Sequence, residues 1–191
     1  MTIEEIKSKY KNGKIPLKAL KKIEENQYLV SDAADSYLRM KNDAKKDGID
    51  ILLPYETSTY RPCGEKGDYK ERSCSDGFTQ WCAWEKYKAG VGNLASNPTK
   101  SSGCSSNHGW GLAIDIKPKK AQDWVKKNGE KYGWWWSGGT FSRVEDWHFD
   151  YDAKRDTFKK PKGKKALIFA GIGIALIGGA SLIYFALRKK K

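Results

Sequence analysis

The sequence predicts an α+β fold, in which helices pack on a small antiparallel sheet, followed by one C-terminal transmembrane helix. Two observations predict the globular part: apolar residues recur at helical spacing in the first 48 residues, and short β-branched stretches follow. A third, an uncharged run at residues 166–187, predicts the membrane helix. With 8 Trp, 10 Tyr and 39% hydrophobic residues, the 191-residue chain can bury one core, which excludes a disordered protein. We therefore expect one domain over residues 1–153.

The N-terminal helices are expected within residues 1–48. Thr2 and Glu5 form a capping-box pattern at the start of the first helix. Ser31 is expected to cap a longer helix that ends at Gly48. Its apolar face contains residues at helical spacing: Ala33, Tyr37, Met40 and Ala44.

The middle of the chain combines short strand patterns with loops. The compact apolar run Ile49–Leu53 is typical of a buried strand, and Thr57–Tyr60 predicts a neighbouring one. Residues 63–75 have the composition of an inserted loop. Phe78–Lys88 has helical character, and the Gly-, Ser- and Asn-rich residues 91–105 predict a long loop.

The last third alternates strand, helix and strand. Leu112–Ile116 is predicted as a strand, Ala121–Lys127 as a helix, and Val144–Tyr151 as a final strand. Because side chains alternate along a strand, Glu145 and His148 would then lie on opposite faces. A bulge would be needed to bring both side chains to one site.

The formal charge of +13 is unevenly distributed. Residues 154–191 contain eleven Lys and Arg against one Asp, a net charge of +10, which leaves +3 for residues 1–153. The domain has no basic stripe with interleaved aromatic residues, so we expect no nucleic-acid partner.

The uncharged run at residues 166–187 lies between a basic linker, residues 154–165, and a basic tail, residues 188–191. As a helix its 22 residues would reach roughly 33 Å, enough to cross a bilayer. The lipid bilayer is therefore an expected partner, and the small residues Ala175 and Gly179 could support helix–helix self-association.

The N-terminus predicts no cleaved signal peptide, because residues 1–22 are polar and Lys-rich. We therefore expect a single-pass membrane protein inserted from the cytoplasmic side. This arrangement would suit a phage protein in an internal virion membrane or in the host cell membrane.

Four cysteines lie between the middle of the chain and the first histidine: Cys63, Cys74, Cys82 and Cys104. Their spacing contains no Cys-x-x-Cys, so a structural zinc site is not expected. They could form two disulfides, with three possible connectivities, or remain buried thiols.

Both histidines of the chain lie in two short segments, one ending at Asp115 and one beginning at Glu145. Catalytic zinc is held by three nitrogen or oxygen ligands and keeps a fourth position for water. His108, Asp115 and His148 would supply those ligands to Zn²⁺. Glu145 would be free to act as the base that takes a proton from water. We therefore expect the small sheet to carry a zinc site.

The two segments together resemble a known family. Its pattern, Ser-x-His-x-x-Gly-x-Ala-x-Asp followed by Glu-x-Trp-His, is matched by Ser106, His108, Gly111, Ala113, Asp115, Glu145, Trp147 and His148. These motifs are those of the zinc D-alanyl-D-alanine carboxypeptidases, the VanY-like peptidases, and related phage cell-wall hydrolases. The resemblance covers roughly residues 10–152 and includes Ser58–Arg61, Gln80 and Tyr132–Trp134.

The resemblance implies a membrane-anchored zinc metallopeptidase of the D,D-carboxypeptidase type that cuts peptidoglycan stem peptides. Arg61 would stabilise negative charge on the scissile carbonyl, unless it forms only a surface salt bridge. Ser106 would contact substrate or orient His108, and Gln80 would contact substrate or brace the loop. Two alternatives use the same fold: an endopeptidase for peptidoglycan cross-links, and a non-catalytic zinc-bearing wall-binding module.

Overall fold

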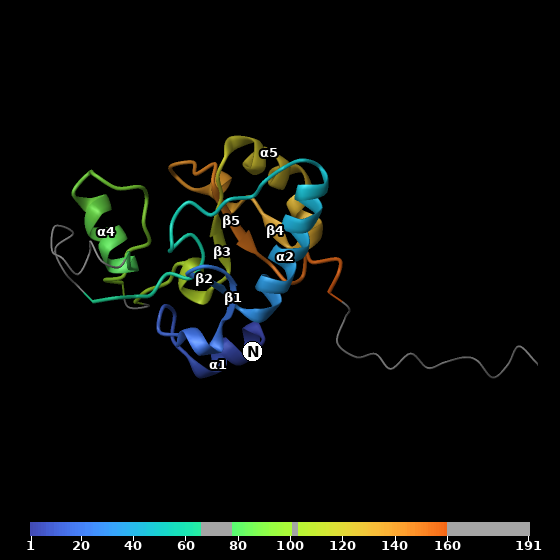
Figure 1. Cartoon of the computed structure of the whole chain (residues 1–191). Helices are drawn as coiled ribbons and strands as arrows, with labels where there is room; N and C mark the ends of the chain where they lie inside the picture. Colours follow the sequence, from blue (N-terminus) through green and yellow to red (C-terminus); the bar gives the residue numbers. More distant parts are fainter. Residues whose placement is uncertain (66–77, 101–102, 160–191) are drawn as a thin grey trace, which may run out of the picture. The chain divides into compact units, whose positions relative to one another are not determined.

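The computed structural model describes residues 1–65, 78–100 and 103–159 (Figure 1). These residues form an α+β arrangement with two small antiparallel sheets, β1-β2 and β3-β5-β4. Short 3₁₀ turns connect the elements at Leu17–Ala19 (η1), Asn107–Trp110 (η2), Gly129–Tyr132 (η3) and Ser137–Thr140 (η4).

The first two helices largely follow the sequence pattern. Helix α1 spans Ile3–Lys9, and its capping box is formed by Thr2 and Glu5 as predicted. Helix α2 spans Ser31–Lys46, but its N-cap is Val30, so the prediction that Ser31 caps the helix is wrong by one position. The predicted apolar face of α2 is confirmed as core: Ala33, Tyr37, Met40 and Ala44 are all fully buried.

The first sheet is a hairpin that the sequence patterns did not indicate. Strand β1, Lys21–Glu24, pairs with β2, Gln27–Leu29, around a turn in which Asn26 has a φ of 54°. Strand β1 is Lys-rich and partly exposed along its whole length, so it lacks the alternation of a half-buried strand.

The two strands predicted before residue 61 are not formed. Ile51 is buried, but Leu52 is 53% exposed and forms only an isolated bridge with Lys117. The segment around Ser58 and Tyr60 is a turn whose backbone groups bond separate partners, since Tyr60 N–H donates to Tyr28 O. Burial here therefore comes from turn packing, not from a sheet.

One face of the second sheet packs in the hydrophobic core, and the other face carries polar side chains. Strand β3, Ala113–Asp115, and strand β4, Trp134–Trp135, flank β5, His148–Tyr151, on either side (Figure 1). Ile114 is paired with Phe149, and both are fully buried in the core with Trp134. Because side chains alternate along each strand, the neighbouring pair Asp115 and His148 faces the other way.

The later helices follow the predicted ranges closely, whereas the last strand is shorter than predicted. Helix α4 spans Gln80–Lys88 and α5 spans Lys119–Asn128. Strand β5 begins at His148, and Glu145 lies before it in a turn closed by His148 N–H on Glu145 O. The turn removes the strict alternation between the two residues, so no bulge is needed.

The residues directly after β5 pack against the domain. Asp156 is buried and accepts hydrogen bonds from Arg39, at 2.8 Å, and from the Tyr151 hydroxyl, at 3.0 Å. Lys159 forms an ion pair with Asp32 of α2. The compact unit therefore extends to Lys159.

The predicted single-pass membrane architecture requires correction. Over the ranges that the structure describes, no helix is long and apolar enough to cross a bilayer. The longest of these helices, α2, has 16 residues and would reach roughly 24 Å, and it carries charged residues on one face. The predicted span at residues 166–187 and its tail lie outside the described residues. The predicted bilayer partner and the virion or host-membrane location depended on that span, and no described helix supports them.

The packing of α2 predicts unequal effects of two truncations in this helix. Met40→Ala should lower the free energy of unfolding by about 2–5 kcal/mol, because the Met40 side chain is fully buried in the core. Leu38→Ala in the same helix is the matched control, since Leu38 is 38% exposed and should lose much less. Urea unfolding of both variants measures the difference, and equal losses would contradict the described packing.

Candidate active site

Strand pairing brings Asp115 and His148 together. The two residues are direct partners in the β3–β5 register, so their side chains lie side by side on one face of the sheet. His108 arrives from the η2 turn just before β3. Ser106 caps this turn, because its Oγ accepts the His108 N–H at 3.3 Å. Gly111 ends the turn with a φ of +65°, a conformation that favours glycine.

The three side chains converge on one point. His108 Nε2 lies 3.2 Å from His148 Nδ1 and 3.3 Å from Asp115 Oδ1, and His148 Nδ1 lies 3.1 Å from the same carboxylate oxygen. Both histidines are more than nine-tenths buried. The structure therefore brings together the three predicted metal ligands, which come from η2, β3 and β5.

The second ring nitrogen of each histidine has its own oxygen partner. His108 Nδ1 lies 2.7 Å from Thr59 O, and His148 Nε2 lies 3.2 Å from Asp150 Oδ1. A carbonyl or carboxylate oxygen only accepts, so a hydrogen on each of these two nitrogens would satisfy both contacts. In the neutral imidazoles, His108 Nε2 and His148 Nδ1 then present lone pairs, and both lone pairs face Asp115 Oδ1.

This donor set passes a geometric test for a metal ion. Zinc bonds of about 2.0–2.1 Å in a tetrahedron place neighbouring ligand atoms roughly 3.3 Å apart. The three measured separations lie between 3.1 and 3.3 Å. Metal-bound histidines usually donate their other N–H to a carbonyl or carboxylate, as His108 and His148 do. The residues can therefore hold one cation.

Burial and charge act differently on the two histidines. Burial lowers the pKa of His108, and the nearby Asp115 offsets it only in part. Burial also opposes the charged form of His148, but hydrogen bonds to Asp115 and Asp150 outweigh it and raise its pKa to about 10. Burial would raise the pKa of Asp115, yet the two histidines hold it well below its usual range. Asp115 is thus ionised, and its negative charge favours a positive charge at the centre of the cluster.

Glu145 is 7% exposed and is held by its backbone. Its N–H donates to Gly138 O at 3.1 Å, and its carbonyl accepts the Trp136 indole N–H at 3.0 Å. Burial raises the pKa of the Glu145 carboxyl, and the charges of His148, Asp115 and Arg61 also act on it. Its carboxyl is thus within electrostatic reach of the metal-site residues.

Arg61 also belongs to the site and is not a surface residue. Its side chain is 16% exposed, and Nη2 lies 3.4 Å from Asp115 Oδ2. The guanidinium carbon lies 5.2 Å from the Phe78 ring centroid, and the Arg61 N–H donates to His108 O at 3.1 Å. The cation is therefore fixed beside the candidate metal ligands in a partly dehydrated position.

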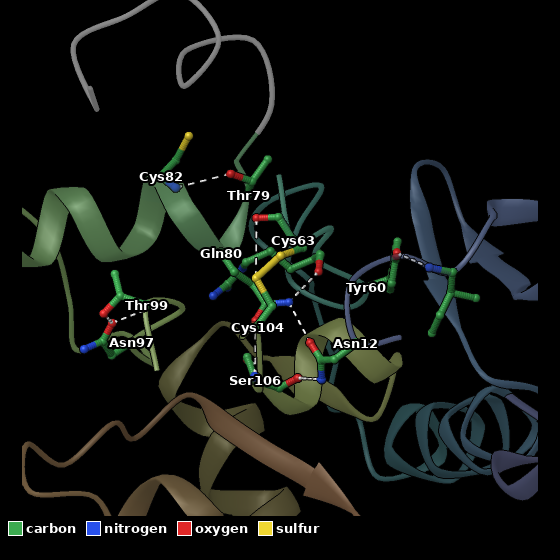
Figure 2. The surroundings of a disulfide bond; sticks show 12 residues. Asn12, Tyr60, Cys63, Thr79, Gln80, Cys82, Asn97, Thr99, Cys104 and Ser106 are labelled. Atoms are coloured by element: carbon green, nitrogen blue, oxygen red, sulfur yellow. Dashed lines mark hydrogen bonds between the residues drawn. A yellow bond between two sulfur atoms is a disulfide. The ribbon is translucent and has the colours of Figure 1, made fainter. Parts of the chain in front are cut away.

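Gln80 holds the loop that carries Ser106 and His108 through side-chain hydrogen bonds (Figure 2). Its Nε2 donates to Asn12 Oδ1 at 2.9 Å and to Arg61 O at 3.3 Å, and its Oε1 accepts the Ser106 N–H at 3.2 Å. A side chain at Gly109 would lie 2.0 Å from Asn12 Oδ1 and would collide with this network. Because the Gln80 amide is 3% exposed and bonded to protein, the geometry favours bracing over substrate contact.

A disulfide connects the same two segments that Gln80 bonds, the one near Arg61 and the one near Ser106. Cys63 is bonded to Cys104, which precedes the motif by two residues (Figure 2). The Cys63 N–H donates to Gly13 O, and the Gly13 N–H donates to Gly109 O, both at 2.8 Å. The bond thus links the segment after Arg61 to the loop that carries His108. Cys82 lies in α4, and Cys74 lies outside the described residues.

Two site residues escaped the sequence analysis, Asp150 and Thr59. Asp150 follows His148 by two residues on the same strand, so a His-x-Asp pattern on one face could have indicated it. Thr59 acts through its backbone carbonyl, which leaves no signal in the sequence.

The comparisons agree with the motifs. The family model for VanY, D-alanyl-D-alanine carboxypeptidase, matches residues 26–154, which is more than half of the chain. The chain therefore belongs to the VanY family, which confirms the resemblance to the D-alanyl-D-alanine carboxypeptidases. No curated protein matches the sequence.

Solved structures with a similar fold have low sequence identity. A zinc(II) complex of a vancomycin resistance D,D-pentapeptidase VanY mutant is 16% identical and covers 72% of this chain and 82% of its own, with a TM-score of 0.45. VanYB in complex with D-alanine-D-alanine is also 16% identical, covers 72% and 80%, and has a TM-score of 0.48. Two structures of DacB from Streptococcus pneumoniae, one of them described as an L,D-carboxypeptidase, are each 19% identical and cover 69% and 75%, with TM-scores of 0.43 and 0.42.

The disulfide predicts a loss of both stability and activity when it is removed. Replacing Cys63 and Cys104 together with serine releases a constraint over 41 residues, worth about 4 kcal/mol in the loop-entropy account. The looser link between Arg61 and the motif loop should also reduce turnover below the unfolding temperature. Thermal unfolding and peptide hydrolysis measure the two effects, and a double variant with wild-type values in both would contradict the bracing role.

The Glu145 turn predicts a requirement for glycine at position 138. A Cβ there would lie 2.0 Å from Glu145 O, so Gly138→Ala must displace the Glu145 backbone. Hydrolysis should fall at least about tenfold, which corresponds to about 1.4 kcal/mol of transition-state stabilisation. Thr140→Ser in the same turn keeps the hydroxyl that donates to Ser137 O and should stay close to wild type. If Gly138→Ala hydrolyses stem peptide at the wild-type rate, the turn does not position Glu145.

Proposed function

We propose that this domain is a zinc-dependent peptidase that hydrolyses D-alanine-containing stem peptides of peptidoglycan, in the manner of a D,D-carboxypeptidase. The observation that carries the proposal is the convergence of His108 Nε2, His148 Nδ1 and Asp115 Oδ1 at mutual distances of 3.1 to 3.3 Å. Membership of the VanY family supports the substrate class.

His108, Asp115 and His148 are the proposed zinc ligands. When bound, zinc would act as a Lewis acid and would lower the pKa of its water, so that this water could lose a proton at neutral pH. Thr59 O and Asp150 keep the other nitrogens of the two imidazoles protonated, so the ligand atoms face the ion without rearrangement.

Glu145 is the proposed general base and acid. It accepts a proton from the attacking water and passes that proton to the leaving amine. Burial raises the pKa of the Glu145 carboxyl, which strengthens it as a base while leaving it able to release the proton. Its backbone contacts with Gly138 and Trp136 hold it in place without using the carboxylate.

Arg61 is the proposed partner of the oxyanion that develops on the scissile carbonyl. A guanidinium remains charged in proteins, and its interaction with developing negative charge is stronger where water is excluded. The Arg61 side chain is 16% exposed and is anchored by Asp115 on one side and Phe78 on the other. It therefore needs little reorganisation as the charge develops.

The role of Glu145 is tested by Glu145→Ala. General-base catalysis typically contributes about 10²- to 10⁴-fold, so hydrolysis should fall by that factor while the bound zinc stays at the wild-type level. Glu130→Ala is the matched control, because Glu130 is two-thirds exposed and pairs with Arg155 on the surface. Mass spectrometry of a defined stem pentapeptide measures the released D-alanine, and metal analysis measures zinc. Undiminished hydrolysis by Glu145→Ala would refute the mechanism.

The same assay assigns the bond that is cut. Release of one D-alanine from a linear pentapeptide is the expected product of a D,D-carboxypeptidase. Cleavage only of cross-linked muropeptides would instead identify an endopeptidase, and zinc binding without any product would identify a non-catalytic module.

A further inference from the structure

We propose that Asp150 is a positioning residue that fixes the His148 tautomer and ring orientation, so that Nδ1 and not Nε2 is the metal-binding atom. This inference rests on the proposed zinc site and adds to it a residue that neither family motif contains. It follows from the contacts of His148 on its two sides.

The Asp150 carboxylate is placed by the strand. His148 and Asp150 are two residues apart on β5 and share one face of the sheet. Asp150 Oδ1 lies 3.2 Å from His148 Nε2, and the two residues are 7% and 6% exposed. Strand β5 is the central strand, paired on one side with β3 and on the other with β4. The Asp150 backbone is therefore held by both neighbours.

The residue opposite Asp150 leaves room for its side chain. Ala113 of β3 is the direct partner of Asp150 in the register, and it is fully buried. Directly paired side chains lie about 4.5–5.5 Å apart, so a larger residue here would press on the carboxylate. The small Ala113 of the motif thus allows the contact between Asp150 and His148.

Without Asp150, His148 has a competing arrangement. Its Nδ1 lies 3.1 Å from Asp115 Oδ1, a distance at which Nδ1–H would donate a hydrogen bond. That tautomer would remove the lone pair from the metal-facing nitrogen and would also occupy the carboxylate oxygen of a second ligand. By accepting the Nε2 hydrogen, Asp150 favours the metal-binding tautomer over this closed pair.

His108 is held differently from His148. His108 Nδ1 donates to the backbone carbonyl of Thr59, a contact that no side-chain substitution removes. The His148 contact is made by a side chain, so its contribution to metal binding can be measured directly.

The experiment measures zinc affinity of the full chain by competition with a chromogenic chelator. Second-sphere partners of this kind typically contribute about 10- to 100-fold, so D150A should weaken zinc binding by that factor. D150N should lose much less, because its amide oxygen can still accept the Nε2 hydrogen. D156A is the matched control, since Asp156 is also a buried carboxylate but bonds Arg39 and Tyr151. Its zinc affinity should be unchanged.

A second readout follows the ring hydrogen itself, in the wild type and in D150A. The chain contains only two histidines, so ¹⁵N-histidine labelling gives two ring systems that can be assigned separately. In the zinc-loaded wild type, His148 should show metal on Nδ1 and a slowly exchanging hydrogen on Nε2. In D150A that hydrogen should exchange rapidly with water.

Three results would overturn the inference: metal on Nε2 of His148 in the wild type, wild-type zinc affinity in D150A, or an equal loss in D150A and D156A. If the wild type itself binds no zinc, the proposed function fails. If the wild type binds zinc and D150A binds it equally well, only the role of Asp150 fails.

Discussion

The antiparallel pairing of β3 with β5 is the constraint on which the rest of the site depends. Its register sets Asp115 beside His148 on one face and Ile114 beside Phe149 on the other. One set of backbone hydrogen bonds thus fixes both the core and the proposed metal ligands. A slip of β5 by one residue would turn His148 into the core and place the Phe149 ring at the site. The buried apolar face therefore protects the geometry of the polar one.

The opposite face shows how two buried histidines are held as candidate metal ligands. Burying an imidazole without partners costs free energy, so each ring gives its second nitrogen a fixed acceptor, Thr59 O for one and Asp150 for the other. The loop that carries His108 is also held in place. Gln80 and the bond from Cys63 to Cys104 connect the His108 turn to the segment that carries Arg61. The catalytic proposal depends on this rigidity, since a base and a cation act efficiently only in a preorganised site.

The sequence predicted the parts whose chemistry requires particular side chains. The ligand residues and Glu145 stand out because a chain with only two histidines places both beside carboxylates. Other parts left weaker signals. The hairpin of β1 and β2 is Lys-rich, and the turn before β5 forms through backbone contacts with Gly138, so neither follows hydrophobic alternation. The apolar run at residues 166–187 suggested a membrane protein, and no helix among the described residues supports it.

The central claim is that one metal ion is held by the two histidines and Asp115. X-ray absorption at the zinc edge, on the full chain loaded with one equivalent of zinc, tests it most directly. The account predicts a shell of nitrogen and oxygen at about 2.0–2.1 Å, with the scattering pattern of two imidazoles. Because the chain also contains four cysteines, a sulfur shell at about 2.3 Å is the clear alternative. A sulfur shell, or zinc with fewer than two imidazoles, would contradict the account.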